Sequence, residues 1–277
     1  MVGENKTKIK SSFLKRLLSG IFLLIALFFI LFIGGDLLFI ACSIISIIGL
    51  IELFQVFKLA NSTLAYISYV LTIFYYLMLR IYSSLGILLF LISLLLFLLA
   101  FYVFSYPKYD IKEVSMIFFG IIYVAVTFSF IYLIREKNEF GKQIVWLIFI
   151  SSWGSDTFAY CTGMLIGKHK FLPILSPNKT IEGVFGGIIG AAILGVLYNI
   201  IFLNNFYLDP AYSSIQIGIA CACGALISIL GDLAASAIKR DNNVKDYGNL
   251  IPGHGGILDR FDSVMFTAPA LFFLLSI

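Results

Sequence analysis

Long, nearly charge-free apolar runs recur along the whole chain, and they leave few folds open. A helix that crosses a bilayer needs about 20 apolar residues, and nine of these runs have about that length. A soluble globule of 277 residues would need more polar surface than they leave, and a membrane β-barrel would alternate polar and apolar positions. The predicted fold is therefore all-α, a polytopic membrane bundle with spans at 17–33, 37–57, 64–79, 85–104, 114–134, 144–165, 177–203, 215–238 and 257–276.

The placement of Lys and Arg predicts how this bundle is oriented. With nine spans and a cytoplasmic N-terminus, fifteen of the nineteen Lys and Arg residues fall on the cytoplasmic side, as cytoplasmic loops favour. The first twelve residues resemble a hydrophilic tail, and no small-residue cleavage pattern follows the first apolar run. We therefore expect a multi-pass protein of the cell (inner) membrane with both of its polar loops in the cytoplasm.

The two halves of the chain differ in the polar groups that their apolar runs carry. Residues 1–140 hold few such groups beyond Glu52, whereas the apolar runs after residue 140 contain Asp156, Glu182 and Asp232. Charged side chains inside membrane segments usually mark function. We expect residues 141–277 to be the catalytic region, with two cytoplasmic loops. Residues 1–140 are either a transmembrane scaffold or an oligomerisation domain that would support a homodimer.

The most informative stretch is residues 236–262, SAIKRDNNVKDYGNLIPGHGGILDRFD. It is densely charged in a chain of which only 12% is charged. Cations at this density suit phosphate groups, and carboxylates among them suit a metal ion that also touches phosphate. The candidate site residues that it contributes are Lys239, Arg240, Lys245, Asp246, His254, Gly255, Gly256, Asp259, Arg260 and Asp262.

The helix before this stretch presents a polar face. Ser228, Asp232, Ser236 and Lys239 are spaced by four, four and three residues, so they share one side of the helix. Two interpretations stay open for Asp232. It either pairs with Lys239 as a structural tie, or it binds a metal ion while Lys239 contacts a phosphate.

The glycines after Pro252 lead into the last predicted helix. Backbone N–H groups of Gly255 and Gly256 can approach an oxyanion closely, and the helix that follows supplies its positive end. Asp259 either complements this helix end or joins Asp232 in holding Mg²⁺ against a nucleoside triphosphate. His254 either orders the backbone or transfers a proton.

A third element lies between residues 151 and 183. Asp156 stands in an apolar run, and Ser176 is a plausible N-cap with Pro177 at the first helical position, which would place Lys179 and Thr180 in the first turn. Glycine pairs spaced by four residues predict close helix packing in the next span. From this element we take Asp156, Lys179, Thr180 and Glu182 as candidate substrate-binding residues.

Residues 236–262 resemble the signature of the phosphatidate cytidylyltransferases (CDP-diacylglycerol synthases). A second block is similar too, through Ser155-Asp156, Ala159-Tyr160, Gly167-Lys168, Ser176-Pro177, Lys179-Thr180 and Glu182-Gly183. The resemblance implies an enzyme of phospholipid biosynthesis that joins CTP and phosphatidic acid, using Mg²⁺, to give CDP-diacylglycerol and pyrophosphate. Asp232, Asp259, Lys239 and Arg260 would be catalytic, with Asp232 and Asp259 as metal ligands. A second cation would fit, because more carboxylates converge than one Mg²⁺ takes from protein.

Other classes make different demands on the sequence. A transporter could use Asp156 and Asp232 as ion sites, but inverted repeats between the halves are not evident. A lipid-alcohol kinase that takes CTP as phosphoryl donor would release CDP instead of pyrophosphate. A CDP-alcohol phosphotransferase would need a D-G-x-x-A-R type block, which this sequence lacks. The expected partners are CTP, phosphatidic acid and the bilayer, with no nucleic acid.

Overall fold

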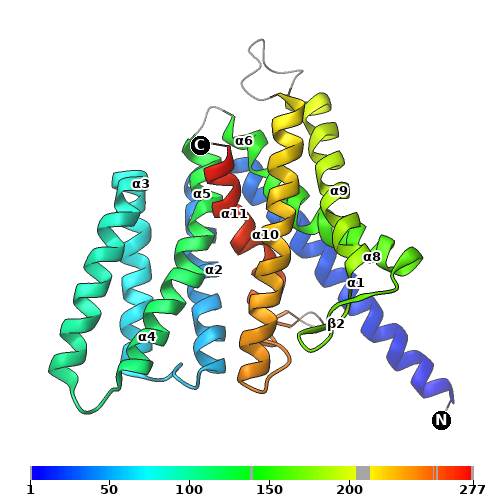
Figure 1. Ribbon diagram of the computed structural model, residues 1–277. Helices are drawn as coiled ribbons and strands as arrows, with labels where there is room; N and C mark the ends of the chain where they lie inside the picture. Colours follow the sequence, from blue (N-terminus) through cyan, green and yellow to red (C-terminus); the bar gives the residue numbers. More distant parts are fainter. Residues whose placement is uncertain (1, 138–139, 204–212, 252, 254, 276–277) are drawn as a thin grey trace. The chain divides into compact units, whose positions relative to one another are not determined.

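The computed structural model describes residues 2–137, 140–203, 213–251, 253 and 255–275. The chain is mostly helical, as predicted (Figure 1). It forms two compact units. Unit 1 comprises Met1–Ala125 and Val244–Arg260, and unit 2 comprises Val126–Asn243 and Phe261–Ile277. Part of the charged stretch therefore folds with the N-terminal residues, although it lies more than a hundred residues away from them in the sequence.

Unit 1 begins with two helices that meet at a glycine pair. Helix α1 ends at Ile33 and α2 begins at Gly35, with Gly34 at φ 70° and Gly35 at φ 56°. Backbone with positive φ favours glycine because it has no Cβ. The predicted break between the first two apolar runs is confirmed. The helices of this unit are α1 (Val2–Ile33), α2 (Gly35–Val56), α3 (Thr63–Ser105) and α4 (Ile111–Gly120), followed by the π-helix η1 (Ile121–Val126).

Helix α3 runs through two of the predicted spans with helical backbone throughout, and it doubles back on itself (Figure 1). The ring centroids of Tyr75 and Phe90 lie 4.7 Å apart. Fifteen residues of straight α-helix would separate them by about 22 Å. The chain therefore reverses within α3, and the two arms match the candidate spans Thr63–Tyr82 and Leu85–Ser105.

The interior of unit 1 combines apolar packing with a few paired hydroxyl groups. Leu50, Leu53 and Phe54 of α2 are fully buried. A Cβ on Gly120 would lie 2.6 Å from the Phe54 ring, so α4 can approach α2 closely only because this residue has no side chain. Ser46 of α2 shares a buried hydrogen bond of 2.8 Å with the Tyr76 hydroxyl of α3, which satisfies both polar groups away from water.

Unit 2 contains shorter helices and a two-stranded hairpin. The predicted span at 144–165 is divided among several helical segments with a π-helix in the middle, and an antiparallel pair of strands follows it. The elements are α5 (Thr127–Lys137), α6 (Gly141–Ile144), α7 (Trp146–Phe149), η2 (Ile150–Gly154), α8 (Ser155–Ile166), β1 (Lys170–Leu172), β2 (Ser176–Thr180), α9 (Ile181–Tyr198), η3 (Asn199–Leu203), α10 (Ser214–Asp241) and α11 (Leu258–Leu274). The first turn of α11, up to Arg260, belongs to unit 1.

The predicted start of the helix at Ser176 and Pro177 is wrong. These residues lie in β2, where Ser176 is paired with Leu172, and the helix begins at Ile181. Thr180 is the N-cap instead, because its hydroxyl accepts a hydrogen bond of 3.1 Å from the Gly183 N–H. Pro177 fits a strand of a two-stranded sheet as well as a helix start, because an outward-facing position needs no backbone donor.

Helix α9 packs against α8 through glycines, as the spacing of these residues predicts. A Cβ on Gly183 would lie 2.8 Å from the Ala159 carbonyl oxygen, and one on Gly187 would lie 2.8 Å from that of Ser155. Small residues at such positions let two helix backbones approach each other. This packing fixes α8 beside the start of α9, where several candidate site residues lie.

Six helical segments within the described residues are long and apolar enough to cross a membrane. They account for six of the nine predicted spans. The other three correspond to the 16-residue apolar part of α1 (Leu18–Ile33), to the divided segment that ends in α8, and to α11, which has 17 residues. The six are Gly35–Val56, Thr63–Tyr82, Leu85–Ser105, Ile111–Glu136, Ile181–Leu203 and Ser214–Asp241.

Candidate functional site

Lys179, in strand β2 of the unit 2 hairpin, forms an ion pair with Asp232 of α10. The Lys179 ammonium nitrogen lies 2.5 Å from Oδ2 of Asp232, and both side chains are about a quarter exposed, at 24% and 28%. An aspartate inside an apolar helix is costly without a partner, and this ion pair supplies one. The structural tie considered for Asp232 from the sequence was with Lys239, whereas the partner found here is Lys179.

Two further aspartates interact with Asp232. Asp156 of α8 interacts electrostatically with both Asp232 and Lys179. Asp262 of α11, only 8% exposed, interacts with Asp232, Asp156 and Lys239. The name acidic cluster is used below for Asp156, Asp232 and Asp262. The structure thus brings together acids from three helices, although Asp156 and Asp262 lie more than a hundred positions apart in the sequence.

A glycine beside Asp232 makes this convergence sterically feasible. A Cβ on Gly231 would lie 2.8 Å from the Asp262 carbonyl oxygen and 3.0 Å from Cβ of Phe266. Helices α10 and α11 therefore touch at Gly231, immediately next to Asp232. The close approach of the two backbones is what places the Asp232 and Asp262 side chains in the same cluster.

Glu182 and Thr180 are occupied by local structure at the start of α9. Oε1 of Glu182 lies 2.7 Å from Nδ1 of His169, and both Glu182 oxygens accept from the His169 backbone N–H at 3.3 Å. The Thr180 hydroxyl serves as the N-cap of α9. Glu182 therefore secures the base of the hairpin that carries Lys179, and a contact with substrate stays a prediction for both residues.

In unit 1, the described residues 244–251, 253 and 255–257 lead from the end of α10 to the start of α11, and they are called the motif loop below. Gly253 and Gly255 have φ of 79° and 89°, a backbone region that favours glycine. Oδ2 of Asp259 accepts hydrogen bonds from the N–H groups of Tyr247, at 2.8 Å, and Gly256, at 3.0 Å. The Asp259 carboxylate therefore links Tyr247, early in the motif loop, to Gly256 at its end.

The remaining charged residues of this stretch face outward. Arg240, Lys245, Asp246 and Arg260 are exposed, and Lys239 is half-buried. Exposed cations of this kind are available to phosphate groups of a ligand. His254 lies outside the described residues, so its predicted role is untested.

Glu52 is the functional candidate that the sequence did not assign. It lies in α2, nearly 200 residues before the motif loop, yet its two oxygens accept from the N–H groups of Ile257 and Leu258, each at 2.9 Å. A carboxylate alone in an apolar run was the signal that could have found it. Its partners, however, are backbone groups, which sequence patterns do not reveal.

The predicted metal ligands Asp232 and Asp259 belong to unit 2 and unit 1 respectively, and their pairing stays a prediction. Within the described residues, no group of three or more His, Cys, Asp or Glu side chains is arranged to hold a metal ion. The acidic cluster offers carboxylate oxygens, the donors that hard cations prefer, and the binding of a metal ion there stays a prediction.

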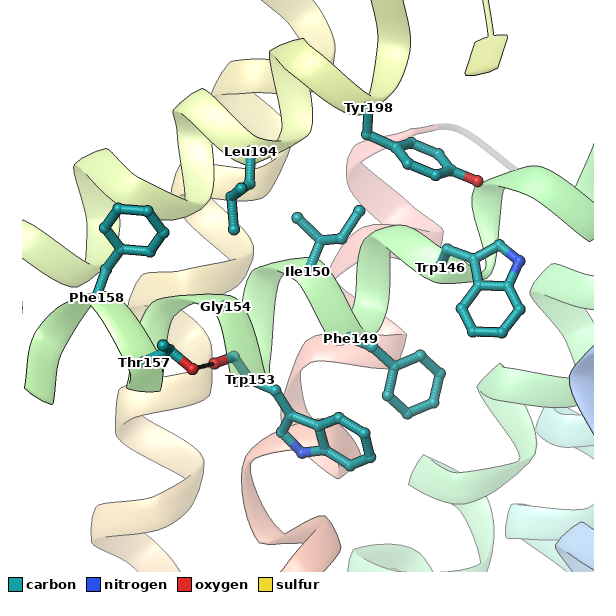
Figure 2. Close-up of a pocket in the computed structure, with 9 residues that line it drawn as sticks. All are labelled: Trp146, Phe149, Ile150, Trp153, Gly154, Thr157, Phe158, Leu194 and Tyr198. Carbon is teal, nitrogen blue, oxygen red and sulfur yellow. Dashed lines mark hydrogen bonds between the residues drawn. The ribbon is translucent and has the colours of Figure 1, made fainter. Parts of the chain in front are cut away.

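A separate pocket of unit 2, of about 430 Å³, has a different character (Figure 2). Figure 2 shows Trp146, Phe149, Trp153 and Phe158 lining it from the segment that ends in α8, with Tyr198 opposite on α9. None of the candidate site residues lines this pocket. The charged chemistry and this aromatic pocket are therefore distinct features of the unit.

Comparison with known proteins gives consistent matches. Residues 14–277 match the profile of the cytidylyltransferase family. The phosphatidate cytidylyltransferase of Bacillus subtilis (strain 168) is 37% identical over 182 residues, which are 66% of this chain and 65% of that protein. The protein of the same name from Staphylococcus aureus (strain COL) is 38% identical over 187 residues, 67% of this chain and 68% of that one. The similarity to each thus covers about two thirds of either protein.

Proposed function

Because the chain belongs to the cytidylyltransferase family, we propose that it is a phosphatidate cytidylyltransferase of membrane phospholipid biosynthesis. It transfers the cytidylyl group of CTP to phosphatidic acid and releases pyrophosphate, leaving CDP-diacylglycerol in the membrane. The observation that carries this proposal is the family match over residues 14–277, together with relatives of that name at 37–38% identity.

The reaction depends on neutralising the negative charges of the two substrates and of the leaving group, and it needs no strong base. A phosphate oxygen of phosphatidic acid attacks the α-phosphorus of CTP, and the bond from that phosphorus to the oxygen bridging to the β-phosphate breaks. The electron pair of this bond leaves with pyrophosphate. Since the nucleophile is already an anion, the protein must bring two anions together and stabilise the charge that develops on the leaving group.

The basic residues of the two charged regions suit this task. Lys179 and Lys239 stand among the acidic cluster, so each can bridge a carboxylate and a phosphate oxygen. Arg240, Lys245 and Arg260 are exposed at or near the motif loop and would contact phosphates of CTP or of the lipid. Asp246, Thr180, Glu182, His254, Gly255 and Gly256 complete the proposed substrate-binding set.

Mg²⁺ is the proposed cofactor, with Asp232 and Asp259 as its protein ligands. Mg²⁺ takes one or two carboxylates from protein and fills its other positions with water and phosphate oxygens. The mutual repulsion of Asp156, Asp232 and Asp262 supports a divalent cation beside them. When bound, the cation offsets the negative charge of the triphosphate and of its leaving group. A second cation has carboxylates available in Asp156 and Asp262.

The protein is a membrane protein, and we place its active site at the cytoplasmic face. The proposal adds three crossings to the six candidate spans, giving nine with a cytoplasmic N-terminus. It rests on the excess of Lys and Arg on that side and on the substrates, because CTP is cytosolic while phosphatidic acid lies in the bilayer. No nucleic acid is needed, and residues 1–140 are compatible with either a scaffold or a homodimer contact.

Product identity tests the function. The purified protein in detergent is given phosphatidic acid, Mg²⁺ and CTP labelled at the α-phosphate. The expected outcome is label in a lipid-soluble liponucleotide with equimolar release of pyrophosphate, and no label in the lipid when phosphatidic acid is omitted. Formation of CDP together with a newly phosphorylated lipid would instead identify a CTP-dependent lipid kinase. A parallel panel of ATP, GTP and UTP tests the preference for cytosine.

A further inference from the structure

Glu52 is a buried acid in the apolar helix α2, and nothing in the proposed reaction uses it. Glu52 is only 5% exposed, and it lies within the candidate span Gly35–Val56. Removing a carboxylate from water is costly unless hydrogen bonds or counter-charges compensate for the lost hydration. A buried acid at this position therefore needs hydrogen-bond donors or positive charge close to both of its oxygens.

Those partners are the backbone N–H groups at the start of α11, one from Leu258 and one from Ile257 just before it. The N–H groups of Ile257 and Leu258 donate to Oε1 and Oε2 of Glu52, each at 2.9 Å. The first N–H groups of a helix have no acceptor within the helix, and the helix dipole makes a negative charge favourable there. Both oxygens of Glu52 are thus engaged in the same task at the end of the motif loop.

The surrounding glycines leave room for this carboxylate. A Cβ on Gly248 would lie 2.7 Å from Oε1 of Glu52, and one on Gly256 would lie 2.5 Å from Oε2. Neither glycine has the positive φ that would itself require glycine, in contrast to Gly253 and Gly255. The absence of side chains at Gly248 and Gly256 is therefore explained by the space that Glu52 occupies.

A second carboxylate completes the arrangement. Asp259 accepts from the N–H of Gly256, so the consecutive N–H groups of Gly256, Ile257 and Leu258 all donate to carboxylates. Asp259 also accepts from Tyr247 at the start of the loop. The orientation of Asp259, and of Arg260 next to it, thus depends on where Glu52 holds the start of α11.

We propose that Glu52 is a positioning residue for catalysis, which sets the motif loop and the Asp259 carboxylate in their working geometry from the N-terminal part of the chain. This inference rests on the proposed cytidylyltransferase function. It assigns to α2 a part in activity, beyond that of a membrane scaffold. A cap that only stabilised the fold would instead alter the amount of folded protein and leave the turnover of each folded molecule unchanged.

The test compares Glu52→Gln with Ser46→Ala. Gln keeps one acceptor oxygen but turns an NH₂ group toward a backbone N–H, so one of the two hydrogen bonds is replaced by a clash of donors. We expect kcat per folded molecule to fall about tenfold or more, since a hydrogen bond to a charged group is worth about a factor of ten or more, while KM for CTP changes about threefold or less. Ser46 is equally buried in α2, but its hydroxyl bonds Tyr76, so its kcat should stay within about twofold.

A double-mutant cycle with Gly248→Ala identifies the contact itself. The added methyl group displaces the Glu52 carboxylate, so Gly248→Ala alone should lower kcat in the same way as Glu52→Gln. In the Glu52→Ala background the clash is gone, and Gly248→Ala should cost no further activity. Additive losses, a normal kcat in Glu52→Gln, or an equal loss in Ser46→Ala would each overturn the proposal.

A measurement independent of activity separates this inference from the proposed function. Backbone hydrogen exchange of the peptide covering residues 247–260 should accelerate in Glu52→Gln and stay unchanged in Ser46→Ala. Unchanged exchange in Glu52→Gln would overturn the positioning role even if the enzyme reaction is as proposed. If the wild-type protein forms no liponucleotide, the proposed function fails, and accelerated exchange would still support Glu52 as the residue that orders the loop.

Discussion

Lys179 and a metal ion should compete for the Asp232 carboxylate. Removing the lysine charge should therefore make the acidic cluster bind a divalent cation more tightly. The lysine nitrogen lies 2.5 Å from Oδ2 of Asp232. At an effective dielectric constant of about 20, two unit charges 4 Å apart interact by about 4 kcal/mol. Because both side chains are about a quarter exposed, screening by solvent reduces the effect of removing the lysine charge to about 2 kcal/mol, or about 30-fold.

Lys179→Met removes the charge while retaining a long side chain. The acidic cluster then loses one of two nearby lysines, and we expect it to bind a divalent cation about 30-fold more tightly in the absence of nucleotide. Mn²⁺ binding, followed by electron paramagnetic resonance, measures this as a spectroscopic substitute for Mg²⁺. The same variant should lose turnover, because it removes the proposed contact of Lys179 with a phosphate group.

Asp232→Asn is the matched control. It should weaken Mn²⁺ binding, and Lys179→Met added to it should give little further tightening, because the competition for the carboxylate no longer exists. Unchanged or weaker Mn²⁺ binding in Lys179→Met alone would refute the reasoning, since Asp232 would then not be both the partner of Lys179 and a ligand of the cation.

Two further predictions concern Asp259 and Gly231. Asp259→Ala should abolish CTP-dependent liponucleotide formation while the protein still elutes as a folded species in size-exclusion chromatography; near-normal turnover would remove the proposed metal role. Gly231→Leu should lower the thermal unfolding midpoint and the activity together, because its Cβ would already lie 2.8 Å from the Asp262 carbonyl oxygen and overpacking costs about 1–3 kcal/mol. An unchanged midpoint in a thermal scan would show that α10 and α11 do not meet there.

The sequence predicts the helical membrane fold because the length of its apolar runs, and their near lack of charge, already match membrane-spanning helices. The break at Gly34 and Gly35 was predictable for the same local reason, since two adjacent glycines interrupt an apolar pattern. The start of the helix after β2 was not, because Ser176 and Pro177 satisfy the rules for a helix start and also for a strand. Pairing with β1 decides between the two structures, and that pairing is a tertiary contact.

The sequence singles out the acids of the acidic cluster, but it does not reveal which residues they contact. Asp156, Asp232 and Asp262 stood out as acids in or beside apolar runs, and the structure brings them together. The partner of Asp232 was not predictable, since helical periodicity pointed to Lys239 on the same helix, while Lys179 comes from a hairpin. Glu52 was visible as an isolated acid, but its partners are backbone N–H groups, which have no residue type to recognise.

Unit 1 is built from two separate segments of the chain, and this limits how relatives of this protein can be recombined. Exchanging residues 1–125 with those of another member would combine a foreign α2 with a native motif loop, and the space beside Gly248 and Gly256 would accept only a side chain of matching length. A fragment that starts after residue 125 would keep the acidic cluster but lack the acceptor for Ile257 and Leu258. Chimeras should therefore keep activity when helix and loop come from the same parent, or when the foreign helix carries an acid of the same length at this position.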